Sequence, residues 1–189
     1  MKQNVDFFES GKIYHVFSRA IGNEILFKEP ENYRFFLEKF DFYCGHLIET
    51  LAYCLIPNHF HFLVRINENA SNQEVVKSFS DFLNSYTKCF NKTSERNGGL
   101  FQRKFKRKLI SDEDYLTRIV LYIHWNPIKH NLTDDFSLWK YSSYRAYLSE
   151  KPSKINRNLV LEWFGSKEEF KKFHLNNLQA YFPEELKLE

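Results

Sequence analysis

The sequence contains few cysteines, glycines and prolines, and its charge imbalance is small. Its 189 residues include 3 cysteines, 6 glycines and 5 prolines. Cys44, Cys54 and Cys89 are odd in number and show no CxxC spacing, so neither a disulfide framework nor a cysteine metal site is predicted. The formal net charge of +3 does not by itself indicate a nucleic-acid partner, so the positions of the basic residues must decide.

Long apolar runs and nucleotide-binding glycine motifs are also absent. No stretch of about 18 uncharged apolar residues occurs, and the N-terminal segment has no apolar run that resembles a signal peptide. We therefore expect a soluble, cytoplasmic protein with no membrane partner. The chain has neither GxGxxG nor GxxxxGK[ST], so no phosphate-binding glycine loop is predicted.

Apolar and aromatic residues, by contrast, are plentiful enough for one sizeable core. Hydrophobic residues make up 43% and aromatic residues 18% of the chain. The composition changes weakly near residues 151–158. We expect one main domain at residues 1–150, followed by a short helical extension at residues 151–189.

The first part of the chain alternates between strand and helix patterns. β-Branched, aromatic and polar residues alternate at 12–19, which predicts a strand. Apolar residues at helical spacing after Pro30 predict a helix. Two apolar runs, 51–56 and 59–66, flank the turn sequence Pro57-Asn58, so we expect an antiparallel hairpin.

The second part continues this alternation. Ser71 and the glutamate three residues later form a capping box before an apolar helical stripe, which predicts a second helix. Residues 100–110 alternate basic and apolar side chains, which predicts a strand. A third helix is expected to begin after Ser111 and to stop at Pro127.

The order of these elements predicts the fold class. Strand, helix, strand, strand, helix, strand, helix corresponds to an α+β fold with a ferredoxin-like antiparallel sheet and helices packed on one face. A C-terminal helical segment is added to it. Short helices are expected after Asn158, with Ser166 and Glu169 as a further capping box.

A pair of histidines lies two residues apart on the second strand of the predicted hairpin. His59 and His61 should project from one face of the strand, where two neutral imidazoles can converge on one metal ion. The alternative is a pair of buried structural histidines whose nitrogens bond to neighbouring carbonyls. The apolar surroundings place the pair in a packed sheet, where polar side chains require partners.

The third predicted helix carries a tyrosine and an asparagine on one margin of its apolar stripe. At about 100° per residue, Tyr115, Tyr122 and Asn126 share a direction, so a helix lying on the sheet could offer them to its polar face. A single tyrosine is more commonly a core or interface aromatic. Pro127 disfavours helical dihedrals at Asn126, so the last turn could be distorted and the amide displaced.

Basic residues concentrate just before that helix, interleaved with two phenylalanines. This pattern is typical of a strand that follows a phosphate backbone and stacks bases on aromatic rings. An edge strand protected from aggregation by its lysines is the alternative explanation. The basic residues of this segment are Arg103, Lys104, Lys106, Arg107 and Lys108.

Five short blocks of the sequence form a recognisable set. They are YHVFSR at 14–19, PNHFH at 57–61, GLFQRKF at 99–105, YIHWNP at 122–127 and WKYSSYRAYL at 139–148. PNHFH is similar to the PNHxH motif of the single-tyrosine HUH transposases, an IS200-like family, and the other blocks resemble, in the same order, those of its REP-associated tyrosine transposase branch. Five ordered blocks make coincidence improbable.

The resemblance implies a metal-dependent strand transferase that cuts single-stranded DNA at hairpin-bearing sites through a 5′-phosphotyrosine. It implies Tyr122 as the nucleophile and His59, His61 and Asn126 as ligands of a divalent metal, with Mg or Mn expected. Arg19 joins the basic segment as an expected DNA contact. His15 and His124 lie in matching blocks and are expected to be structural or DNA-facing.

Two other functions stay open at this point. A domesticated transposase could bind hairpin DNA or RNA as a regulator without cutting it. A metal phosphoesterase could instead use bound water in place of the tyrosine. The sequence also leaves open whether the protein is a homodimer, in which the tyrosine of one subunit serves the other.

Overall fold

The computed structural model describes residues 6–177, apart from the side chains of residues 113 and 114. Its strands and helices follow the predicted order closely. The elements are β1 (Ile13–Arg19), α1 (Pro30–Cys44), β2 (Ile48–Ile56), β3 (His59–Ile66), α2 (Asn72–Thr93), β4 (Lys106–Ile110), α3 (Glu113–Lys129), the 3₁₀ turn η1 (Phe136–Leu138), α4 (Tyr144–Leu148), α5 (Arg157–Phe164) and α6 (Lys167–Asn176).

The four strands form one antiparallel sheet in the order β2-β3-β1-β4, which confirms the predicted α+β class. β3 and β1 are the central strands, and β4 lies at an edge. Residue His61 on β3 is therefore flanked by Phe17 on β1 and Cys54 on β2. This register fixes which side chains surround the histidine pair.

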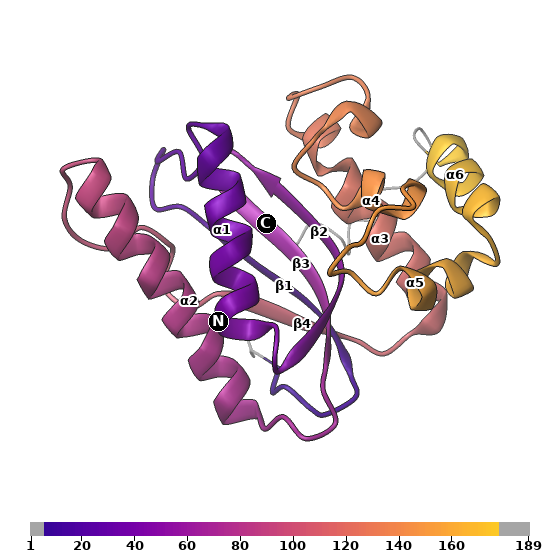
Figure 1. The fold of residues 1–189 in the computed structure, drawn as a ribbon, viewed down its shortest axis with the longest axis horizontal. Coiled ribbons are helices and arrows are strands. Elements are labelled where there is room, and N and C mark those ends of the chain that lie inside the picture. Colours follow the sequence, from indigo (N-terminus) through magenta and orange to yellow (C-terminus); the bar gives the residue numbers. More distant parts are fainter. Residues whose placement is uncertain (1–5, 178–189) are drawn as a thin grey trace, which may run out of the picture.

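Helices cover both faces of the sheet (Figure 1). α1 and α2 pack on one face over a phenylalanine-rich core that includes Phe36, Phe62 and Phe82. α3 packs against β2 and β3 on the other face, in a second core that α5 and α6 complete. The predicted one-sided layer holds for α1 and α2. The third helix adds a layer on the opposite face, because its apolar stripe needs a surface that α1 and α2 do not already cover.

Three predicted boundaries differ from the observed elements. The strand expected at residues 51–56 already begins at Ile48. The strand expected at residues 100–110 begins only at Lys106. Phe101 still makes an isolated bridge to Ala20, but Lys104 has φ of +60°, and this left-handed residue turns the chain before β4 begins. The third helix does not stop at Pro127, since it continues to Lys129.

The capping box predicted at Ser71 is confirmed, whereas the one predicted at Ser166 shows only its serine hydrogen bond. Ser71 accepts from the N–H of Glu74, and the Glu74 carboxylate accepts from the Ser71 N–H, so α2 begins with a complete capping box. Ser166 accepts from the N–H of Glu169 at the start of α6. None of the helices within residues 6–177 is long and apolar enough to cross a membrane.

A buried polar chain fastens α6 to α3 and to β2. His174 Nδ1–H donates to the Phe170 carbonyl at 2.8 Å, so its Nε2 accepts from the Nδ1–H of His124 at 2.9 Å. His124 Nε2 in turn accepts from Ser143 Oγ at 2.7 Å. Ser143 Oγ accepts from the Tyr53 N–H at 2.9 Å. Every polar atom of this chain thus bonds in one consistent direction, with both imidazoles neutral.

Acid should destabilise the fold through these two histidines. Burial lowers the pKa of His174 to about 4, and it lowers the pKa of His124 well below its usual value. The unfolded chain therefore binds more protons than the folded one below about pH 6.5, so stability falls as the pH falls from there towards 4. From the shift of His174 we expect a loss of about 2 kcal/mol at pH 5, to which His124 adds in the same direction, measured by urea unfolding at several pH values.

His174→Gln provides the matched variant, because its amide can accept from His124 and donate to the Phe170 carbonyl without titrating. This variant should retain most of its stability at pH 7.5 and show a smaller acid loss than the wild type. His46→Gln, at an exposed position, should leave the loss unchanged. Equal pH dependence in the wild type and in His174→Gln would contradict the assignment.

Candidate metal and nucleic-acid site

The two histidines predicted as metal ligands lie at the start of β3, on the face of the sheet that α3 covers. His59 and His61 are 3% and 0% exposed, and their ring centroids are 5.1 Å apart with the planes at 79°. Alternation along the strand points both imidazoles to the same face. They form a buried pair between the sheet and the helix.

Each imidazole of the pair is oriented through its Nδ1 atom by a neighbouring side chain. His59 Nδ1 lies 2.7 Å from Asn58 Oδ1. His61 Nδ1 lies 2.9 Å from Nε2 of His15, which is fully buried on β1 and stacks on the His61 ring. Because Asn58 Oδ1 can only accept, the neutral His59 ring carries its proton on Nδ1 and a lone pair on Nε2. A ring in this tautomer can ligate a metal through Nε2.

The turn that carries Asn58 is itself held in place by the loop after β1. The N–H of Ala20 donates to the Asn58 carbonyl at 2.8 Å, and the N–H of Leu26 donates to the Pro57 carbonyl at 2.7 Å. Backbone contacts therefore fix the turn on both sides of its central peptide. This positions the Asn58 side chain against His59.

Tyr122 approaches the histidines from α3. Its ring centroid lies 5.7 Å from that of His61 and 6.0 Å from that of His15, edge-on at 86° and 84°. The side chain is 1% exposed. Lys129 Nζ lies 5.2 Å from the centroid of the tyrosine ring and donates to its hydroxyl at 3.4 Å, a long hydrogen bond. The structure thus brings the phenol and the two imidazoles of the predicted site together.

Asn126 lies one turn after Tyr122 on the same side of α3 and is fully buried. Its Nδ2 donates to the Tyr122 carbonyl at 2.9 Å. Its Oδ1 is buried with no hydrogen-bond partner among the described residues. A buried amide oxygen is costly when it lacks a partner, so this atom is suited to a ligand such as a cation.

Pro127 does not displace Asn126, contrary to the distortion that the sequence suggested. The Asn126 carbonyl accepts from the N–H of His130 at 3.0 Å, and the Pro127 carbonyl accepts from the N–H of Leu132 at 2.8 Å. Pro127 has no N–H to donate to the carbonyl of Ile123. The loss of one helical hydrogen bond is tolerated here because packing on the sheet holds the helix.

The structure adds residues to the site that sequence patterns did not assign to it. His15 contacts His61 directly, and the ring of His130 lies 4.6 Å from that of His59. Lys129 contacts Tyr122. His15 lies in the YHVFSR block, but only the pairing of β1 with β3 places it beside His61, and no sequence signal separates His130 from a surface histidine.

The predicted DNA-binding residues divide between the two faces of the β4 edge. Lys106 and Lys108 face α3, where their Nζ atoms lie 5.7 Å from the rings of Phe17 and Tyr115 respectively. Arg107 faces the other side. Its guanidinium lies 4.6 Å from the Phe8 ring, its Nε donates to the Asp6 carbonyl, and burial lowers its pKa.

The remaining three predicted DNA contacts lie near the end of β1. Arg103 and Lys104 are exposed in the turn before β4. Arg19 lines a small cavity of about 100 Å³, together with His59, Lys104 and Lys106. His59 therefore faces a small cavity that is lined by three cations. β4 is an edge strand, so protection of that edge by its lysines also remains a valid explanation.

The donor set at this site suits a divalent cation of mixed nitrogen and oxygen preference. Two imidazole Nε2 atoms and the Asn126 Oδ1 are all buried on the α3 side of the sheet. No group of three His, Cys, Asp or Glu side chains suited to a metal occurs in the part of the chain that the structure describes. An ion held by the two imidazoles would need a further ligand of another kind, and the buried Asn126 Oδ1 is a candidate.

Comparison with known proteins now identifies the family. Residues 13–126 match the family described as "Transposase IS200 like". The chain belongs to the IS200-like transposase family. The matched range contains the histidine pair, Tyr122 and Asn126, and the family expectation from the sequence is confirmed.

Two further proteins are similar to the chain. A protein of Haemophilus influenzae described as a REP-associated tyrosine transposase is 34% identical in an alignment of 109 positions, and the match covers 53% of this chain and 62% of that protein. A solved structure of a REP-associated tyrosine transposase bound to a REP hairpin has a TM-score of 0.64 and 17% identity, covering 80% of this chain and 89% of that one. The latter likeness confirms the fold.

The buried Asn126 should cost stability when no metal is present. Asn126→Leu removes the buried oxygen and keeps a side chain of similar size, so the free energy of unfolding without metal should rise by about 1 kcal/mol. Thermal or urea unfolding in EDTA measures this. Asn84→Leu, at an exposed position on α2, should change stability by less than about 0.5 kcal/mol. A clear loss of stability in Asn126→Leu would show that the amide is fully satisfied.

Proposed function

We propose that this chain is a metal-dependent DNA strand transferase that cleaves single-stranded DNA by forming a covalent bond through Tyr122. The observation that carries the proposal is the approach of the Tyr122 ring to His61, which lies beside His59, with the centroids of the Tyr122 and His61 rings 5.7 Å apart. Asn126 lies one helical turn after Tyr122 and donates to its carbonyl. Membership of a transposase family supports it. The solved relative is bound to a REP hairpin, and we infer hairpin-bearing single strands as the substrate class here.

His59, His61 and Asn126 would hold the divalent ion, which would neutralise charge on the scissile phosphate. Asn58 and His15 would keep the two imidazoles in the tautomer and orientation that present Nε2. Imidazole ligands are compatible with Mn, and phosphate chemistry with Mg or Mn.

Tyr122 would supply the nucleophile. A bond forms between its hydroxyl oxygen and phosphorus while the bond from phosphorus to the 3′ oxygen breaks, leaving a 5′-phosphotyrosine and a free 3′-hydroxyl. The phenolic proton leaves to solvent, and the departing 3′ oxygen takes one up. The Lys129 ammonium would stabilise negative charge on the tyrosine oxygen. Because the phosphodiester energy is kept in the covalent link, rejoining needs no nucleotide cofactor.

The distances favour a tyrosine that acts within its own subunit. Tyr122 contacts His61 of the same chain, with the ring centroids 5.7 Å apart. The phenol is also almost fully buried, so the scissile phosphate must enter between the sheet and α3 before attack. The cation-lined cavity beside His59 is the outlet through which we expect it to enter.

Replacement of the nucleophile should abolish covalent capture. Wild-type protein incubated with a labelled single-stranded hairpin and Mn or Mg should give a denaturant-stable adduct on a gel, and Tyr122→Phe should give none. Tyr115→Phe, on the same helix, should retain the adduct. A Tyr122→Phe adduct would disprove the assignment. Hairpin binding without any wild-type adduct would support a non-cleaving regulator, and cut DNA with no protein attached would support water as the nucleophile.

Removal of the His15 ring should weaken metal binding without unfolding the protein. His15→Leu leaves His61 Nδ1 without its oriented partner, so the Mn affinity, measured by titration calorimetry, should fall about 10–100-fold. His15→Gln, whose amide oxygen can accept from His61 Nδ1, should recover most of it. If the His15→Leu and His15→Gln variants bind Mn equally well and have equal thermal stability, His15 does not orient His61.

A further inference from the structure

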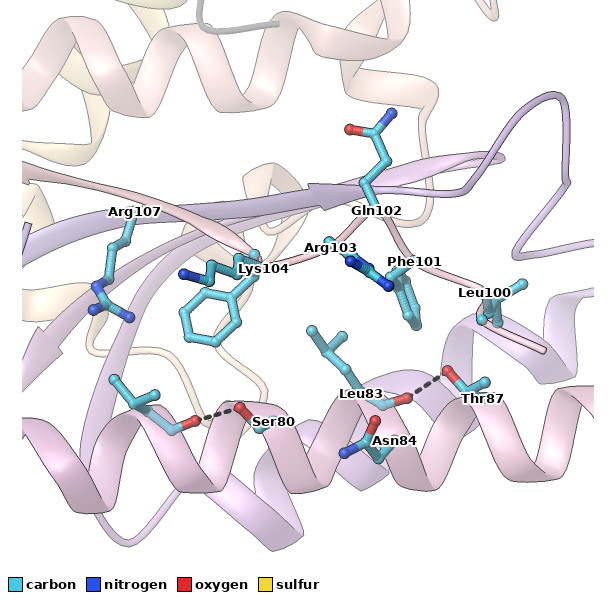
Figure 2. A pocket seen from close by; sticks show the side chains of 13 residues that line it. Ser80, Leu83, Asn84, Thr87, Leu100, Phe101, Gln102, Arg103, Lys104 and Arg107 are labelled. Atoms are coloured by element: carbon cyan, nitrogen blue, oxygen red, sulfur yellow. Dashed lines mark hydrogen bonds between the residues drawn. The ribbon is translucent and has the colours of Figure 1, made fainter. Parts of the chain in front are cut away.

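A groove outside the proposed catalytic site runs between α2 and the segment that precedes β4. It lies between residues 76–87 of α2 and residues 99–107, has a volume of about 570 Å³, and is hereafter the α2 groove (Figure 2). That volume is within the usual range of about 300–1,000 Å³ for ligand sites. The groove is on the opposite side of the 99–107 segment from His59, because α2 and α3 cover opposite faces of the sheet.

The far wall of the α2 groove is held rigidly by the end of β1. The N–H of Gln102 donates to the Arg19 carbonyl at 2.8 Å, and the N–H of Ile21 donates to the Leu100 carbonyl at 2.9 Å. Phe101 pairs with Ala20 as an isolated bridge. The wall is therefore formed in the free protein and does not need a ligand to order it.

The charge of the α2 groove is of one sign. Arg103, Lys104 and Arg107 line it, and none of its lining residues is an aspartate or glutamate. Arg103 and Lys104 are exposed. Asp6 lies near Arg107 and partly balances its charge, so Arg103 and Lys104 are the cations that an anionic ligand would meet. Exposed cations that line a groove favour a polyanionic strand over a neutral ligand.

The α2 groove and the cavity beside His59 share part of their lining, since Gln102 and Lys104 line both of them. In Figure 2 Gln102 points away from α2, while Phe101 and Arg103 point towards it, so the segment offers side chains to both openings. A phosphate chain that passed around this segment from one opening to the other would meet the cations Lys104 and Arg103.

The remaining lining is suited to nucleobases. Asn84 lines the α2 groove, and among the described residues its amide has no hydrogen-bond partner. Ser80 and Thr87, which also line the groove, donate to carbonyls of their own helix. A side-chain amide can donate to and accept from one base edge. Phe101 is half-buried and adds a ring for stacking.

We propose that the α2 groove binds nucleotides of the single-stranded DNA that adjoins the scissile phosphate, with a base seated against Asn84 and Phe101 and its phosphates against Arg103 and Lys104. The proposal deepens and rests on the proposed strand transfer, since it assigns a path for the substrate strand away from the histidine pair. It gives α2 a role in substrate binding.

Filling the α2 groove tests this inference. Asn84→Trp places an indole in it, and Gln73→Trp places one at an exposed position on the same helix outside it. Equilibrium binding is measured for a hairpin alone and for hairpins that carry a single-stranded flank on the 5′ or the 3′ side. A flank of about eight nucleotides is long enough to span the distance from the His59 cavity through the α2 groove. The wild type should bind one flanked hairpin at least about 10-fold more tightly than the bare hairpin.

Asn84→Trp should remove this gain, with bare-hairpin affinity unchanged, whereas Gln73→Trp should keep it. Arg103→Gln should reduce the gain and lower the salt dependence of flank binding by about one charge. A 2-aminopurine scanned along the flank should change its fluorescence at one or two positions, and Asn84→Trp should abolish that change.

Two results would overturn the inference: a wild-type protein that gains nothing from either flank, and an Asn84→Trp variant that keeps the full gain. Loss of the gain in Gln73→Trp as well would show that the effect does not come from the groove. Failure of the strand-transfer proposal is seen separately, because binding needs no Tyr122 adduct. If the flank binds but no covalent adduct forms, the strand-transfer proposal is wrong. If the adduct forms but the flank adds no affinity, only the proposed binding of DNA in the α2 groove is wrong.

Discussion

Burial of polar groups between the sheet and α3 is the constraint on which the rest of this structure depends. Two imidazoles, a third behind them and an amide occupy a face of the sheet that would otherwise be filled by aliphatic side chains. Each such group costs free energy when it is left without a partner. Hydrogen bonds to Asn58 and His15 offset this cost for the two imidazoles, whereas the Asn126 oxygen has no hydrogen-bond partner among the described residues.

The two faces of the sheet differ in composition and in role. On the α1 and α2 face, stacked phenylalanines such as Phe40 and Phe62, with centroids 3.9 Å apart, supply apolar burial. On the α3 face, apolar contacts hold the helix on both sides of Tyr122. A hydrogen bond between His124 of α3 and His174 of α6 joins the helix to the C-terminal helices. The apolar layer thus stabilises a sheet whose other face can hold chemistry.

The edge of the sheet at β4 links the proposed chemistry to the proposed strand path. Alternation of side chains along β4 sends Lys106 to the histidine face and Arg107 to the other. The left-handed residue Lys104 ends this alternation and exposes the preceding turn. Because the turn lines both the His59 cavity and the α2 groove, one short segment can guide a polyanion around the edge.

The sequence by itself determined the periodic elements, the fold class and the family. Period-two and helical patterns located every strand and the long helices, and PNHFH placed His59 and His61 on one strand face, because such patterns are local consequences of backbone geometry. Only the tertiary structure decided the rest. The register of β1 with β3 set His15 against His61, packing held α3 helical through Pro127, and the choice of face brought Tyr122 to the imidazoles. Those outcomes depend on contacts between residues far apart in the chain, which no local pattern encodes.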